Sequence, residues 1–272
     1  MIGRAAYVAA VLLGLGISRL LPEHGPGLFL RLGAATLVVL LPGRLIARAL
    51  GRRSAASTLA WTLASLTVAL GAVFLLRTSF TLALWILFAI GAAALLVPRR
   101  ELEPRPSGRA LVTAGGLILG ALLWHVAPRA LVGDSPFHVA RVRKLVELGS
   151  LTPGRLDELV GGGLHPGYAF PLWHAFLAAV SKLAGVDPSL VVQHESALLV
   201  PLAVAVAFEA GFALFGSAAL AAAAVAALVV TWGDSHGGGL TERALAAIGT
   251  DPVLHVVIEQ PSEARLFDLR TG

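Results

Sequence analysis

Most of the side chains that could do chemistry lie in residues 133 to 173, or directly after them. This polar loop segment begins with an acid, Asp134, which is followed by two histidines and a group of three neighbouring basic residues, and a third histidine comes directly after the segment. They are His138, His165 and His174, and Arg141, Arg143 and Lys144. A positioned carboxylate can act as a general base, and guanidinium groups can hold phosphate with charge-assisted hydrogen bonds. The segment is therefore the first candidate for a functional site.

A short helix is predicted to position these groups. Asp134, Ser135 and Pro136 resemble a helix start, with a capping oxygen followed by proline, and Gly149 resembles a helix end. The predicted helix, 136–148, alternates apolar and basic residues, which is typical of a helix lying at a membrane interface. Asp134 and His138 are four positions apart and are expected on one side of its first turn. Asp134 could also serve only as a cap, and the basic residues only as interfacial anchors.

Composition sets the class of protein that carries this segment. Of 272 residues, 57% are hydrophobic and only 14% are charged, with a mean hydropathy of +0.81, which exceeds ordinary soluble domains. The expected fold is an all-α polytopic membrane protein. The absence of cysteine excludes disulfides and thiolate metal sites. An arginine excess in such a chain encodes orientation, so no nucleic-acid partner is expected.

Eight apolar runs are long enough to be predicted as membrane spans. A five-span region, 1–126, precedes the loop 127–167, and a three-span region, 168–232, follows it. The predicted spans are Ala5 to Leu21, Leu28 to Leu50, Ala55 to Leu76, Phe80 to Val97, Ala110 to Val126, Tyr168 to Leu183, Leu190 to Phe215 and Ala218 to Trp232.

Arginine placement predicts the orientation of these spans. Two arginines lie near the end of the second span and two directly follow it, and four lie between the fourth and fifth spans, whereas the alternate loops carry few. Because short loops rich in arginine stay cytoplasmic, the loop 127–167 is expected outside and both termini inside. Tyr168 and Trp173 fit an interfacial aromatic belt where the chain returns to the membrane.

Two acidic residues fall inside the seventh predicted span. Glu195 follows His194 near the start of that span, which this topology places near the cytoplasm, and Glu209 lies deeper. Charges inside a membrane are costly and are usually paired. Lys182 or a neighbouring helix is the expected partner of Glu195, whereas no partner of Glu209 is identifiable from the sequence.

Residues 233–272 lose the apolar runs. They predict a Gly-rich linker, a helix over 241–248, and a β-hairpin of strands 253–259 and 265–269. One helix and two strands bury too little for a stable core. A short soluble α+β tail, the beginning of a domain or its remnant, is therefore expected.

The polar loop segment resembles a known enzyme family. The order of an acid, a basic amphipathic helix, a Gly-Ser-Leu turn and the return HPGYAFPLWH is similar to polyprenyl-phosphate-dependent glycosyltransferases of the type C membrane superfamily, which includes protein mannosyltransferases and aminoarabinose transferases. The resemblance covers about residues 132 to 216. In this chain the acidic loop follows the fifth predicted span, whereas in the family it usually follows the first. A partial family member is expected.

The resemblance implies an activity in the cell envelope. It implies transfer of a sugar from a polyprenyl-phosphate carrier to an acceptor on the outer face of a bacterial cytoplasmic membrane. Asp134 would be general base or divalent-metal ligand and His138 a second catalytic residue. The substrate-binding residues would be Arg141, Arg143, Lys144, His165, Tyr168 and His174. The alternative is a noncatalytic membrane subunit whose outer loop binds lipid or a partner protein; a transporter is disfavoured because no inverted repeat stands out.

Overall fold

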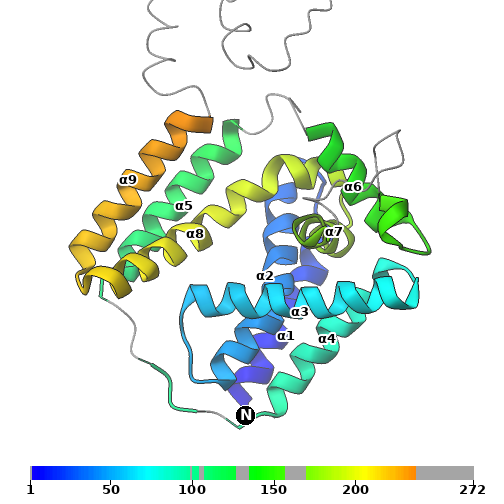
Figure 1. Cartoon of the computed structure of the whole chain (residues 1–272), viewed down its shortest axis with the longest axis horizontal. Coiled ribbons are helices and arrows are strands. Elements are labelled where there is room, and N and C mark those ends of the chain that lie inside the picture. Colours follow the sequence, from blue (N-terminus) through cyan, green and yellow to red (C-terminus); the bar gives the residue numbers. More distant parts are fainter. Residues whose placement is uncertain (1, 99, 104–106, 127–134, 157–169, 237–272) are drawn as a thin grey trace, which may run out of the picture. The chain divides into compact units, whose positions relative to one another are not determined.

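The structure, a computed structural model, describes residues 2–98, 100–103, 107–126, 135–156 and 170–236, which are largely helical and contain no strand (Figure 1). The predicted tail helix and hairpin lie outside these residues. The chain divides into two compact units, Met1–Ala222 and Ala223–Gly272, and the description that follows concerns the first. The helices are α1 (Ile2–Ser18), α2 (Gly25–Ala49), α3 (Ala55–Leu76), α4 (Phe80–Leu96), α5 (Arg109–Val126), α6 (Ser135–Glu147), α7 (Leu172–Ala184), α8 (Pro188–Phe215) and α9 (Ala218–His236), with a 3₁₀ turn, η2 (Pro153–Leu156).

Each apolar run of the sequence forms a helix, and local signals set several ends. The Ser54 side chain accepts a hydrogen bond from the Ser57 backbone N–H at the start of α3, and Asp187 does the same for Ser189 at the start of α8. Gly185 ends α7 and Gly216 ends α8, both in the left-handed conformation. Helix boundaries predicted from the sequence are thus confirmed to within a few residues.

One end of the helices is rich in arginine. We call this end the arginine end. Helices α1, α3 and α5 begin there, and α2, α4 and α8 end there. Arg4 of α1 donates to the backbone oxygen of Val97, just after α4, and Arg109 of α5 donates to the backbone oxygen of Arg53, just before α3. Arg109 also pairs with Glu209 near the end of α8, at 2.9 Å.

The opposite end, where α2, α4 and α8 begin, is called the loop end. Arg31 of α2 donates to the backbone oxygen of Arg19, just after α1, at 2.8 Å. Thr78, between α3 and α4, accepts from the backbone N–H of Leu151, which follows α6. The ring of Trp124, near the end of α5, lies 4.2 Å from the ring of His194 near the start of α8. Helices α1 to α5 and α8 therefore run between the same two ends.

Helix α7 does not connect the two ends. It has 13 residues, fewer than the roughly 20 that cross a hydrocarbon core. Its first turn contacts α6, because His174 lies against His138, and its last residue, Ala184, accepts from Arg31 at the start of α2. Both ends of α7 thus lie at the loop end, whereas the sequence predicted a sixth span here.

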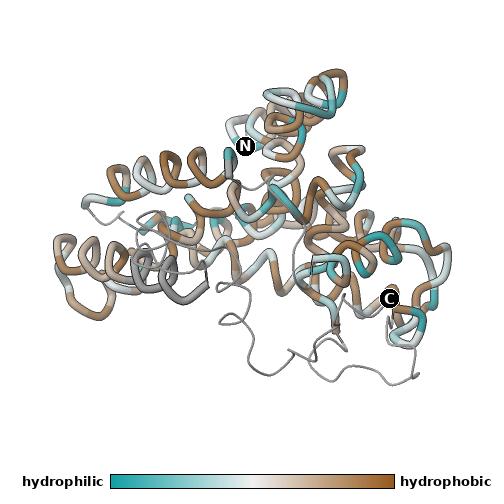
Figure 2. The backbone as a smooth tube through the Cα atoms, turned by 90° about the horizontal axis from the view of Figure 1, so that it is seen from above, coloured by the Kyte–Doolittle hydropathy of each residue, from teal (hydrophilic) through white to brown (hydrophobic). Residues whose placement is uncertain are grey.

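Three helices are long and apolar enough to cross a membrane: α2, α3 and α8. The other apolar helices in the described part of the chain, α1, α4, α5, α7 and α9, have shorter apolar stretches. Figure 2 shows that hydrophobic residues dominate most of the helical tube and that hydrophilic stretches are short. Over the residues that the structure describes, a helical fold with membrane-spanning potential is confirmed, and three of the eight predicted spans meet the length criterion.

Glycines allow the closest helix contacts. In Figure 1, α3 runs across α2, and the two meet at Gly43, where a methyl group would collide with the Thr58 backbone and the Thr62 side chain. On α5, Gly116 and Gly120 face Pro201 and Ala197 of α8 with no room for a side chain. Such small-residue spacing is a usual way for membrane helices to approach closely.

Candidate functional site

Helix α6 is held in the protein by its apolar side. Val139, Val142 and Leu145 are buried, and α6 packs on α7, with further contacts to α8 and η2. The sequence predicted a helix lying at the membrane interface, and in the structure the apolar surface of these three residues is covered by protein. α6 therefore works as a packed platform for the polar groups that it carries.

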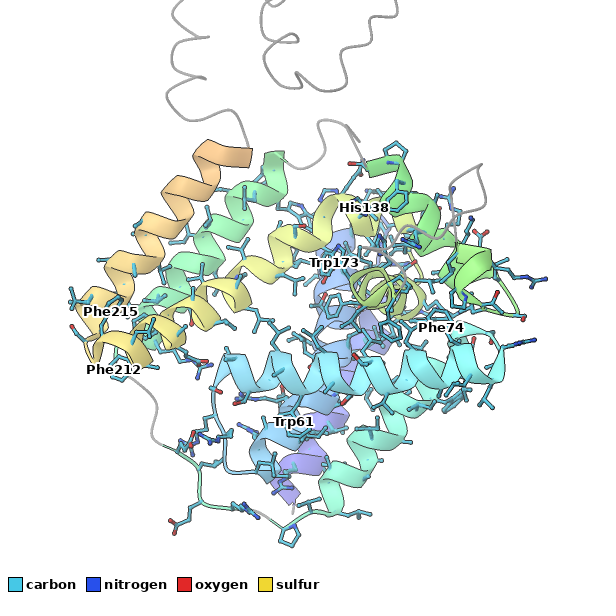
Figure 3. The ribbon with its side chains drawn as sticks, viewed as in Figure 1. Trp61, Phe74, His138, Trp173, Phe212 and Phe215 are labelled. Atoms are coloured by element: carbon cyan, nitrogen blue, oxygen red, sulfur yellow. The ribbon has the colours of Figure 1, made fainter. Side chains whose placement is uncertain are left out.

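Two histidines meet where α6 crosses the start of α7. His138 Nδ1 lies 2.9 Å from His174 Nε2, and the two rings stack with centroids 5.1 Å apart. Phe137 lies edge-on to both rings. Figure 3 shows His138 on α6 and Trp173, the neighbour of His174, on α7. Two predicted site residues that are 36 positions apart in the sequence are thus in direct contact.

Arg141 is the third member of this histidine–arginine cluster. Its side chain is buried, at 1% exposure, and its guanidinium lies 5.4 Å from the centre of the Phe137 ring. Burial, together with the nearby charges of His138 and Arg141, lowers the pKa of His174 to about 4. At neutral pH the His174 imidazole is therefore uncharged and can accept or pass on a proton.

Arg143, another basic residue of α6, connects this helix to α8. Arg143 makes a bidentate ion pair with Asp187, at 2.8 and 2.9 Å, which joins α6 to the start of α8. Hydrogen bonding from Ser189, together with Arg143, lowers the pKa of Asp187 below its usual value. Lys144 is half-buried. Of the three cations predicted to bind phosphate, Arg141 lies beside Phe137 and the histidines, whereas Arg143 is paired with Asp187.

Several predicted site residues lie outside the described residues. They are Asp134, His165 and Tyr168. Asp134 directly precedes α6, and His138 lies on the first turn of that helix. Within the described ranges, no three His, Asp or Glu side chains are placed to hold a metal ion, so the divalent metal expected from the resemblance gains no ligand set there.

Sequence reasoning missed two contributors to this site. Phe137 was counted only as part of an apolar face, yet its ring contacts His138, His174 and Arg141. Asp187 was not considered as a partner for Arg143. The sequence Asp187-Pro188-Ser189 does carry a helix-start signal, but a signal of that kind does not say which cation its acid meets.

Comparison with known proteins leaves the site to be interpreted from its own geometry. No protein-family model, no curated protein and no solved structure matches the chain.

Proposed function

We propose that the chain is a membrane glycosyltransferase, or the part of one, that transfers a sugar from a polyprenyl-phosphate carrier to an acceptor. The observation that supports this most is the buried Arg141 beside the stacked His138 and His174, in the same segment that carries the family resemblance. A buried guanidinium is well suited to the phosphate that leaves with the carrier, because charge-assisted hydrogen bonds are strong where water is excluded.

Asp134 completes the proposed chemistry. Attack of an acceptor hydroxyl or amide on the anomeric carbon releases a proton, which a carboxylate can take. Because Asp134 and His138 are four positions apart, the sequence predicts them on one side of the first turn of α6. In this proposal Asp134 is the base, the neutral His174 and its neighbour His138 relay the proton, and Arg141 steadies the phosphate.

The proposal includes a topology. Helices α1 to α5, α8 and α9 cross a bacterial cytoplasmic membrane, with the arginine end in the cytoplasm as the positive-inside rule requires. The loop end, with α6 and α7, faces outwards. Because α7 stays at that end, the chain crosses seven times, and the C-terminal tail is placed outside. This differs from the eight crossings and cytoplasmic C-terminus expected from the sequence.

A transfer assay tests the function. Membranes containing the full chain are incubated with radiolabelled polyprenyl-phosphate mannose, and with the aminoarabinose donor in parallel, and label in the acceptor fraction is counted. Asp134→Asn is expected to lower transfer by about 100-fold or more, the usual worth of a general base. His174→Gln is expected to lower it less, because His174 acts through its neighbours.

The matched control is Glu147→Gln, an acid at the exposed end of the same helix, which should leave transfer unchanged. Transfer by Asp134→Asn at the rate of the parent chain would refute the enzyme and favour the noncatalytic subunit. In that case disruption of Arg141, Arg143 and Lys144 should be the damaging change.

A further inference from the structure

A second candidate site lies away from the histidine–arginine cluster, between α1, α2 and α4. These helices enclose an open groove of about 370 Å³ whose lining is almost entirely apolar. Its walls include Val8 and Leu12 of α1, Leu41 and Leu45 of α2, and Leu87 and Gly91 of α4. A concave apolar surface with a few polar groups at one end is the usual form of a ligand site.

Arg4 lies near the arginine end of this groove, because its side chain reaches the backbone oxygen of Ala94, next to the lining residue Leu95. It lies one helical turn before Val8, and its side chain is buried, at 6% exposure. Its Nη1 donates to the backbone oxygens of Ala94 and Val97 at 3.4 and 3.0 Å. Its Nη2 has no hydrogen-bond acceptor among the described residues. A buried cation in that state is costly unless an anion or other acceptor completes its bonding.

Arg48 provides a second cation at the same end. It lies about one turn after Leu45 on α2, and its guanidinium is 5.8 Å from the centre of the Tyr7 ring on α1. Its Nε is buried and also has no acceptor among the described residues. Two guanidiniums, each with an unused donor, therefore stand where the apolar groove ends.

We propose that this groove binds one anionic phospholipid, with an acyl chain against α1, α2 and α4 and the phosphate at Arg4 and Arg48. The positive charges of Arg4 and Arg48 favour an anionic headgroup. The apolar walls favour an acyl chain over a soluble ion. Basic pockets between helices on the cytoplasmic side of membranes recognise anionic headgroups in this way. The polyprenyl phosphate of the proposed reaction would bind at the loop end, so the two lipids occupy different ends and the groove does not depend on the enzyme assignment.

Native mass spectrometry of the full chain tests the proposal. The protein is delipidated in mild detergent, exposed to equal amounts of phosphatidylglycerol and phosphatidylcholine, and the retained adduct is measured. Phosphatidylglycerol should be retained preferentially. Arg48→Gln should reduce its retention by about fivefold, the effect expected of one arginine near a lipid surface. Arg52→Gln, an exposed arginine paired with Glu103, is the matched control and should change nothing.

A second pair of variants tests the apolar part of the groove without altering charge. A β-carbon at Gly91 meets only ordinary contacts with Pro42 and Leu45, so Gly91→Leu should fold and fill the groove. Gly71→Leu, on α3 and facing open space, is its control. Loss of the lipid in Gly91→Leu alone supports the proposal. Equal retention of both lipids, unchanged retention in Arg48→Gln or Gly91→Leu, preference for polyprenyl phosphate, or a lipid-free dimer would each overturn it.

Discussion

Helix α8 carries two buried acidic residues, and their surroundings differ. Glu209, at the arginine end, pairs with Arg109 at 2.9 Å and accepts from the backbone N–H groups of Ala55 and Ala56 at 2.8 and 2.9 Å. Both carboxylate oxygens are thus used, and the first turn of α3 is capped. Glu195, toward the loop end, is fully buried, and its one hydrogen-bond partner among the described residues is the neutral Thr36 of α2, at 2.6 Å.

The single hydroxyl hydrogen of Thr36 indicates whether the Glu195 carboxyl is protonated. The Thr36 hydroxyl also lies 2.8 Å from the backbone oxygen of Leu32, yet it has one hydrogen to donate. Both contacts are satisfied together if Thr36 donates to Leu32 and a protonated Glu195 donates to Thr36. The other oxygen of Glu195, Oε2, has no donor among the described residues, which a neutral carboxyl tolerates far better than an anion.

The comparison separates two ways of placing an acid in an apolar helix. Glu209 works as a charge, because its partners are a cation and a helix N-terminus. Glu195 works as a neutral hydrogen-bonding group between α2 and α8. The expected partner Lys182 is not used, since its amine donates to the backbone oxygen of Val146. Only the neighbouring-helix alternative for Glu195 is therefore confirmed.

Removing the charge of Glu209 should have the largest effect. Glu209→Gln leaves Arg109 half-desolvated without its anion and weakens the cap of α3. We expect the free energy of unfolding to fall by about 3 kcal/mol, as when one partner of a buried ion pair is lost. Denaturant unfolding of the purified protein in detergent micelles, followed by circular dichroism, measures the change.

The control for that variant is Glu103→Gln, which breaks the exposed pair with Arg52. Exposed ion pairs contribute at most about 1 kcal/mol, so little change is expected. Equal effects in the two variants would contradict the structural role assigned to the Glu209 charge.

The sequence predicted helices much better than it predicted partners. The run 55–76 was predicted as a helix with the bounds of α3, because Ser54 and the charged Arg77 delimit it locally. The contacts Arg109–Glu209 and Arg143–Asp187 join residues far apart in the chain, and nothing local specifies them. The length of α7 was overestimated because the apolar residues before Leu172 were counted into one run with it. The contact between His138 and His174 also depends on how α6 packs on α7, which no local sequence signal specifies, although both histidines were expected in one site.

His174, like Glu195, is a buried titratable group that is uncharged at neutral pH. Its pKa falls from 6.5 unfolded to about 4 folded, mainly through burial. Between these values the unfolded chain binds more protons, so stability is lost as pH falls from about 6.5 towards 4. Lowering the pH from 7 to 5 should cost on the order of 2 kcal/mol at this residue. Thermal unfolding of the detergent-solubilised protein across this range measures it.

His174→Gln should flatten that pH dependence, because glutamine does not titrate. His24→Gln, which removes an exposed histidine before α2, should keep it. The interpretation fails if both variants retain the slope of the parent chain.

The smallest effect is expected where the acid is already neutral. Glu195→Gln retains the size of the side chain, and its amide can donate to Thr36 as the protonated carboxyl does. We expect the free energy of unfolding to change by less than about 0.5 kcal/mol, the range of a substitution that breaks no interaction. If Glu195 were instead a buried anion, glutamine would remove an uncompensated charge and stabilise the protein by several kcal/mol. The sign and size of this one measurement, made under the conditions used for Glu209→Gln, therefore distinguish a neutral acid from a charged one on the same helix.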